Sequence, residues 1–143
     1  MKVLYSLKKD LDLHPERVAE TQALTLNQAR PLFGLKGTQG LFGSEQWWRS
    51  IEDGLIHTET VAGVITSLYV TGQDHQRSPN AFDFRLQDGS IRSEDMYVNA
   101  PSEVSCYAVG RRVEITYVFD ELKQPLQDGS SQYLDLVAEI RVI

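Results

Sequence analysis

The sequence predicts a mainly β fold with some helix (α+β), in which residues 58–143 form a five-stranded antiparallel barrel. Two segments carry most of this prediction, because apolar and polar side chains alternate along them with the period of two that marks a half-buried strand. They are "RRVEITYVF" (111–119) and "YLDLVAEIRVI" (133–143). A third observation is the Asp88-Gly89 pair, which suits a tight hairpin turn. Five strands in so short a stretch must close, or nearly close, to bury one apolar face.

The first 57 residues predict a separate extension of short helices that packs on this barrel. The opening "KVLYSL" suits either a short strand or a tail segment. A short helix is predicted at "HPERVAETQ" (14–22). Another helical turn is predicted at "TLNQARPLF" (25–33), where Thr25 suits a cap and Pro31 limits the length.

The segment "SEQWWRSIEDG" predicts a helix over residues 45–53. Ser44 is a good N-terminal cap, because its side-chain oxygen can accept a hydrogen bond from a free backbone N–H of the first turn. Gly54 suits the end of the helix, where a left-handed residue is common. This extension therefore ends on a helix just before the first strand of the barrel.

The barrel itself is predicted to have a short helix between its third and fourth strands. The first strand lies in "TETVAGVITSLYVTG", where Gly63 permits a bulge or a sharp bend. The helix is expected at 100–108, since Asn99 suits its cap and Pro101 its first turn. The five strands are expected near 59–71, 81–87, 90–97, 111–121 and 132–142.

This order of elements resembles the OB-fold, a five-stranded Greek-key barrel. Val61-x-Gly63-x-Ile65 is similar to the curved first strand of that fold, and "VGRRVEI" (109–115) to the entry of its fourth strand. The resemblance spans residues 58–143 and implies a fold, not an activity. The "GLFGS…WW" block resembles a family of uncharacterised bacterial proteins, which adds no activity either.

Four glycines at a spacing of three precede the tryptophan pair in "GLKGTQGLFGSEQWW" (34–48). They match neither the G-x-G-x-x-G of a dinucleotide loop nor the G-x-x-x-x-G-K-[ST] of a P-loop. The basic residues that surround a KH clamp are also missing. We expect a packed connector in which the glycines adopt positive φ angles while Leu35, Leu41 and Phe42 pack against the barrel. The glycines are Gly34, Gly37, Gly40 and Gly43.

Trp47 and Trp48 cannot share one helix face, because adjacent helical residues point about 100° apart. Trp47 begins a stripe that continues through Ile51 and Leu55, and this stripe is predicted to be core. Trp48 falls on the more polar side, where it either packs under the N-terminal segment or serves as an exposed anchor for a partner. The candidate partner-binding residues are Trp48, Leu41, Phe42, Gly40 and Gly43.

No cofactor, metal or catalytic site is predicted from the residues. His14, His57 and His75 stand far apart, with no second ligand at metal spacing. Cys106 suits a small buried hydrophobe, since no neighbour in sequence would activate it. Three acidic pairs at element ends are expected to be solvated: Glu52-Asp53, Glu94-Asp95 and Asp120-Glu121.

Charge separates the remaining classes of function. The chain carries a net charge of −6, and from Thr58 onward 13 acidic residues stand against 7 basic ones. Such a surface repels phosphate backbones and suits a basic protein partner, but it also serves solubility alone, which is the more common reason for it. The leading hypothesis is therefore a small, acidic, non-enzymatic module for protein–protein interaction, and an inhibitor or immunity role toward a basic partner is one version of it.

Two alternatives stay open. An OB domain that binds single-stranded nucleic acid could use Tyr69, Phe84, Tyr97 and Tyr117 as stacking platforms. An enzyme whose site is assembled only by the fold is the second alternative. No apolar run is long enough for a membrane span, no signal-type segment opens the chain and only one cysteine is present, so we expect a cytoplasmic protein.

Overall fold

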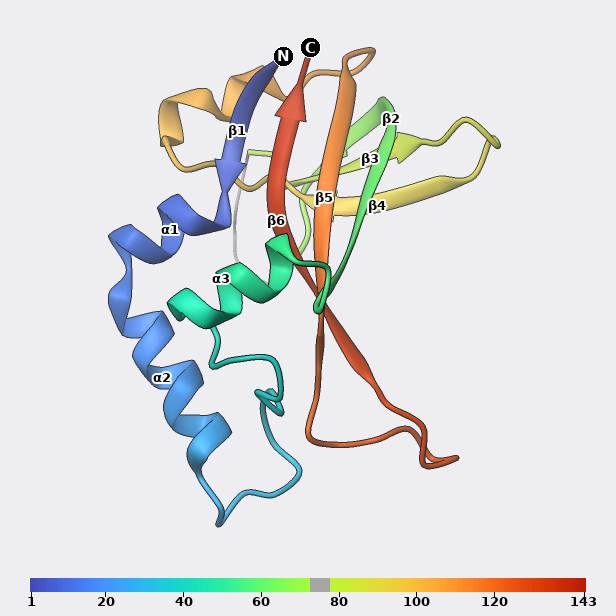
Figure 1. The fold of residues 1–143 in the computed structure, drawn as a ribbon. Coiled ribbons are helices and arrows are strands. Elements are labelled where there is room, and N and C mark those ends of the chain that lie inside the picture. Colours follow the sequence, from blue (N-terminus) through green and yellow to red (C-terminus); the bar gives the residue numbers. More distant parts are fainter. Residues whose placement is uncertain (73–77) are drawn as a thin grey trace. The chain divides into compact units, whose positions relative to one another are not determined.

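The computed structural model describes residues 1–72 and 78–143, so His75 lies outside them (Figure 1). Six strands in the described residues form one sheet, in the order β1-β6-β5-β2-β3-β4. The elements are β1 (Lys2–Ser6), α1 (Leu7–Leu13), α2 (Pro15–Leu26), α3 (Glu45–Glu52), β2 (His57–Tyr69), β3 (Ala81–Arg85), β4 (Ile91–Asp95), the 3₁₀-helix η1 (Pro101–Cys106), β5 (Arg112–Glu121) and β6 (Tyr133–Val142).

The mainly β, antiparallel architecture is confirmed. All five predicted strands are present as β2 to β6, and η1 occupies the predicted place between the third and fourth of them. Alternation is clearest in β5, where Val113, Ile115 and Tyr117 are buried. A Cβ at Gly63 would lie 2.6 Å from the carbonyl oxygen of Arg85, so the close approach of β3 requires a glycine there. The irregularity in the pairing of β2 with β3 lies between Ile65 and Ser67 and not at Gly63.

The predicted closed barrel is wrong, because "KVLYS" forms a sixth strand. In the order of the sheet, closure would join β6 to β4, which requires a free edge on β6. That edge is occupied by β1, with Lys2 opposite Val142 and Ser6 opposite Glu139. The sheet therefore stays open between β1 and β4.

Asn99 covers the backbone of β1 in place of another strand. Its Oδ1 accepts a 2.7 Å hydrogen bond from Ser6 N, and its Nδ2 donates a 3.1 Å bond to the Ser6 carbonyl. Its own N–H donates to the Leu4 carbonyl at 3.0 Å. Asn99 was predicted to cap the short helix, but Ala100 holds that position without a side-chain bond. The asparagine instead satisfies polar groups that an uncovered strand edge would expose.

The chain groups into two compact units. Unit 1 comprises Met1–Ser6, Thr60–Thr116 and Ala138–Ile143, and unit 2 comprises Leu7–Glu59 and Tyr117–Val137. Their cores have different character. Unit 1 buries mostly strand residues, among them Phe82, Phe84, Val113, Ile115 and Ile140, whereas unit 2 buries mostly helix and connector residues, among them Leu7, Leu11, Leu35, Phe42 and Trp47.

Unit 2 contains α1, α2 and α3, and two details correct the predictions. Helix α2 is one continuous helix from Pro15 to Leu26, so the second helical turn expected at 25–33 is absent and Thr25 is not a cap. Residues 27–33 instead form turns. The Lys123 ammonium donates to the carbonyls of Leu24 at 2.7 Å and Arg30 at 3.2 Å, so it satisfies acceptors at the end of α2.

Candidate functional site: an acidic cleft next to the glycine–tryptophan segment

The glycine–tryptophan segment, defined as residues 34–48, is a packed connector. All four of its glycines have positive φ, from +73° at Gly43 to +115° at Gly40, which confirms that prediction. Backbone bonds hold its start in place: Lys36 N donates to the Glu121 carbonyl at 2.9 Å and Lys123 N to the Gly34 carbonyl at 3.0 Å. Further along, Ser50 Oγ donates to the Gln39 carbonyl at 2.7 Å.

Trp47 is the buried centre of unit 2. Its backbone N–H donates to the cap Ser44 at 3.2 Å, as the sequence predicted for this helix. Its side chain is fully buried, and the indole Nε1 donates a 2.9 Å hydrogen bond to Asp120 Oδ2. The Phe42 ring packs edge-on against it at 5.0 Å between centroids.

Trp48 is half-buried. Its ring meets Trp47 edge-on at 4.8 Å, and the Lys8 ammonium lies 5.7 Å from its centroid. Of the other candidate partner-binding residues, Gly40 and Phe42 are buried, whereas Leu41 and Gly43 are half-buried. Their part in binding a partner stays a prediction.

The predicted core stripe stops before Leu55, which is 62% exposed. Helix α3 ends at Glu52 and the chain turns at Gly54, so Leu55 no longer follows the helical spacing from Trp47. Its side chain lines the rim of a cleft instead.

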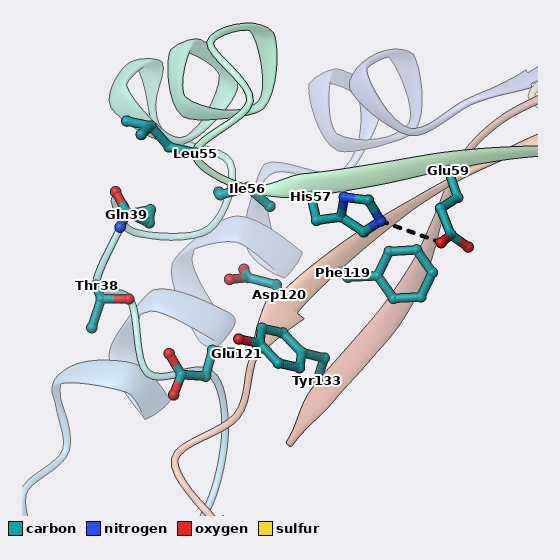
Figure 2. A pocket seen from close by; sticks show the side chains of 10 residues that line it. All are labelled: Thr38, Gln39, Leu55, Ile56, His57, Glu59, Phe119, Asp120, Glu121 and Tyr133. Carbon is teal, nitrogen blue, oxygen red and sulfur yellow. Dashed lines mark hydrogen bonds and ion pairs between the residues drawn. The ribbon is translucent and has the colours of Figure 1, made fainter. Parts of the chain in front are cut away.

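That cleft has a volume of about 520 Å³ and lies entirely within unit 2 (Figure 2). Its walls come from the glycine–tryptophan segment, from the turn before β2, from the end of β5 and from the start of β6. The lining residues are Thr38, Gln39, Leu55, Ile56, His57, Glu59, Phe119, Asp120, Glu121 and Tyr133.

Three carboxylates line the cleft, and no lysine or arginine does so in the part of the chain that the structure describes. Asp120 is only 7% exposed, and this burial raises the pKa of its carboxyl group, although the Trp47 hydrogen bond acts in the opposite direction. Glu121 pairs with Lys36 at 3.3 Å and accepts from Ser131 at 3.0 Å. The Glu59 carboxylate lies 3.3 Å from the imidazole of His57.

Aromatic rings form a second part of the lining. The rings of His57 and Phe119 lie 5.5 Å apart at an angle of 31°. Tyr133 is 55% exposed and lies near Phe119 and Glu121 in the view of Figure 2. The cleft thus combines carboxylates, ring faces and an exposed leucine.

Sequence reasoning missed this site. Asp120-Glu121 was predicted to be a solvated pair, but Asp120 is buried and accepts a hydrogen bond from the indole of Trp47 in the core of unit 2. No local signal could have found the cleft, since its residues come from four separate segments. Cys106, predicted to be buried, is half-buried.

The described residues contain no group of three His, Cys, Asp or Glu side chains that could hold a metal ion, and His75 lies outside them. In the same part of the chain, no helix is long and apolar enough to cross a membrane. The charges are distributed unevenly, because unit 2 carries 12 acidic and 7 basic residues whereas unit 1 carries 8 and 7.

A comparison with protein-family models finds a match over residues 1–143 to the family described as immunity protein RhsI2. The chain belongs to this immunity protein family. No curated protein matches it. The family assignment is consistent with the resemblance to a bacterial protein family and supports the leading hypothesis: the chain has a non-enzymatic, inhibitory role that depends on binding another protein.

Immunity proteins bind a toxin, so the partner of this chain is a protein. For such a role, the arrangement in unit 2 needs no chemistry of its own. A recessed surface that combines charge with exposed rings can recognise a partner and exclude water from the contact.

Proposed function

We propose that this chain neutralises a basic toxin, and that it does so in the cytoplasm by presenting unit 2 to a positively charged surface of the toxin. One observation carries the proposal: the acidic cleft has three carboxylates and no lysine or arginine among its described lining residues. The excess of five acidic residues in unit 2 extends this field beyond the cleft. The single cysteine fits a reducing compartment.

Charge complementarity of this kind acts mainly on the rate of encounter and on the choice of partner. An immunity protein has to intercept its toxin quickly, and an acidic surface increases the association rate with a basic partner. Exposed carboxylates such as Glu59 contribute to this field, whereas rings at the cleft and the half-buried Trp48 supply contact area. The surface proposed to meet the toxin comprises the cleft and the exposed parts of residues 34–48.

The test is a stopped-flow titration of the chain with its cognate toxin domain at two salt concentrations. We expect the association rate to fall several-fold between about 50 and 300 mM salt, because exposed charges are screened beyond a Debye length of about 8 Å. Glu59→Gln should reduce the rate at low salt. Asp95→Asn is the matched control, because Asp95 is an exposed acidic residue of unit 1.

An association rate that ignores both salt and Glu59→Gln would contradict the basic-partner proposal. A rate that falls equally in both variants would show that the field of the whole chain, and not unit 2, attracts the toxin.

A further inference from the structure

We propose that the cleft of unit 2 binds an arginine side chain of the toxin, with Asp120 and Glu59 as the carboxylates available to its guanidinium group and with the rings that line the cleft as its stacking surface. This inference rests on the proposed function, and it adds the chemical group that is recognised and the residues that recognise it.

The size of the cleft suits a long side chain. A volume of about 520 Å³ lies within the range of roughly 300–1,000 Å³ that is typical of sites for small ligands. The cleft is therefore large enough for one long side chain together with the neighbouring backbone. Leu55 and Tyr133, at 62% and 55% exposure, offer apolar surface to the methylene stem of such a side chain.

The carboxylates that line the cleft favour a cation. A buried carboxylate is stable only when paired or hydrogen-bonded. Asp120 is 7% exposed, and its carboxylate accepts a hydrogen bond from a neutral group, the indole of Trp47. The lining residue Glu121 is already paired with Lys36, at 3.3 Å. Within the described residues, neither Asp120 nor Glu59 forms an ion pair with a lysine or arginine. Both carboxylates are thus available to a cation from the toxin.

Arginine and lysine differ in how they bind carboxylates and aromatic rings. Guanidinium is planar, donates in a fixed fork that matches carboxylates, and stacks on aromatic faces, whereas an ammonium ion is compact and more strongly hydrated. The cleft presents both kinds of partner: carboxylates on Asp120 and Glu59, and rings on His57, Phe119 and Tyr133 (Figure 2). This combination matches arginine better than lysine.

A probe experiment tests the cleft without the toxin. N-acetyl-arginine amide is titrated into ¹⁵N-labelled chain, and the indole N–H resonance of Trp47 serves as the reporter, because that group is hydrogen-bonded to Asp120. We expect a saturable shift of this resonance that is absent with N-acetyl-leucine amide and smaller with N-acetyl-lysine amide. Equal shifts with arginine and lysine would overturn the preference for guanidinium.

A second experiment uses the toxin domain and three variants. Asp120→Asn keeps an oxygen that can accept the Trp47 bond but removes the charge, and Tyr133→Ala removes an exposed ring. We expect each to weaken toxin binding at least roughly tenfold, and Asp120→Asn about thirtyfold, since loss of one partner of a buried charge pair has effects of this size. Asp135→Asn is the control, because Asp135 is an exposed acidic residue of unit 2 outside the cleft.

The two proposals fail differently. If the toxin binds in a salt-dependent way but Asp120→Asn and Tyr133→Ala bind as tightly as Asp135→Asn, the arginine site is wrong and the basic-partner proposal stands. If wild-type binding is independent of salt, the basic-partner proposal is wrong as well. The dispersed indole resonance of Trp47 verifies in each variant that the fold is intact, and Glu59→Gln repeats the test at an exposed position that the core does not require.

Discussion

The indole Nε1 of Trp47 donates a 2.9 Å hydrogen bond to Oδ2 of Asp120, and both side chains are buried. The two residues are 73 positions apart, so this bond joins α3 to the end of β5 within unit 2. It has two consequences. It gives the tryptophan N–H a partner in the core, and it holds a carboxylate at the lining of the acidic cleft.

The two tryptophans should differ in their contribution to stability. Trp47→Ala should lower the free energy of unfolding by about 3–5 kcal/mol, the usual range for a large buried aromatic side chain. It also removes the hydrogen bond to buried Asp120. Trp48→Ala should have a much smaller effect, since that ring is half-buried whereas Trp47 is fully buried.

Urea denaturation of both variants checks this prediction. Equally large losses would place both rings in the core and remove Trp48 as a partner anchor. Equally small losses would mean that residues 34–48 are not docked. Toxin binding by Trp48→Ala, which should be weaker than wild type, tests the anchor separately.

Asp120 should give the protein an identifiable pH dependence. Burial raises the pKa of Asp120 in the folded state above its ordinary value of 3.8. The folded state therefore binds this proton more tightly, so the stabilising contribution is complete below 3.8 and is lost as the pH rises through the raised pKa. Asp120→Asn should remove that loss, and the variant should lose less stability than wild type as the pH rises from about 3.5 to 7.

Asp128→Asn provides a control of opposite sign. Hydrogen bonds from the side chain and backbone of Ser130 lower the pKa of Asp128 below 3.8. Its contribution is present above 3.8 and is lost as the pH falls, so this variant should be less sensitive to acid. Urea titrations at several pH values measure both slopes. The same pH slope in Asp120→Asn and wild type would contradict the prediction.

The strands could be predicted from the sequence because period-2 alternation is a local signal. Residues 112–117 show it clearly, although Val118 next to Tyr117 is also buried, and β5 lies where this pattern predicts it. The sixth strand was not assigned because "KVLYS" is short and its pairing with β6 involves residues near the opposite end of the chain. The prediction of a closed barrel was wrong because it overlooked this one long-range pairing, whereas the prediction of the individual strands depended only on local sequence patterns.

The site was less predictable than the fold. The positive φ angles of the glycines and the burial of Trp47 followed from glycine chemistry and helical spacing. Asp120 was not recognisable as a cleft residue, because an acidic pair at the end of a strand is usually solvated. Its environment is set by Trp47, and nothing near position 120 in the sequence indicates that contact.

Gly40 should be the most restrictive glycine of residues 34–48. Its φ is +115°, and a Cβ there would lie 2.9 Å from the backbone N of Trp47 and 3.1 Å from its Cα. Gly40→Ala should therefore combine about 1–2 kcal/mol of backbone strain with a further 1–3 kcal/mol from overpacking. Gly54→Ala is the matched control, because its φ is +76° but nothing lies within 4 Å of an added Cβ.

Thermal and urea denaturation of these two alanine variants measures the difference. Gly40→Ala should be clearly less stable than Gly54→Ala, whose loss comes from φ alone. Equal losses would show that Trp47 and its helix shift at little cost, and that the connector is looser than its contacts indicate.

Nucleic-acid binding should be weak. The chain carries a net charge of −6, and binding to single strands draws much of its affinity from neutralised phosphates. Two of the four predicted stacking rings are in the core, since Phe84 is fully buried and Tyr117 is 3% exposed. The guanidinium of Arg111 is engaged by the backbone carbonyls of Ile143 at 2.7 Å and Cys106 at 3.1 Å.

We therefore expect a Kd of about 10⁻⁴ M or weaker for single-stranded DNA or RNA at physiological salt. Fluorescence anisotropy with labelled oligonucleotides at two salt concentrations measures it. Micromolar binding that weakens steeply with added salt would show that a local basic groove outweighs the net negative charge of the chain. The candidate residues for such a groove are Arg85, Arg92, Arg111 and Arg77, the last of which lies outside the described residues. Arg85→Gln would then have to weaken that binding and reduce its salt dependence, while toxin binding through unit 2 stayed unchanged, because Arg85 belongs to unit 1.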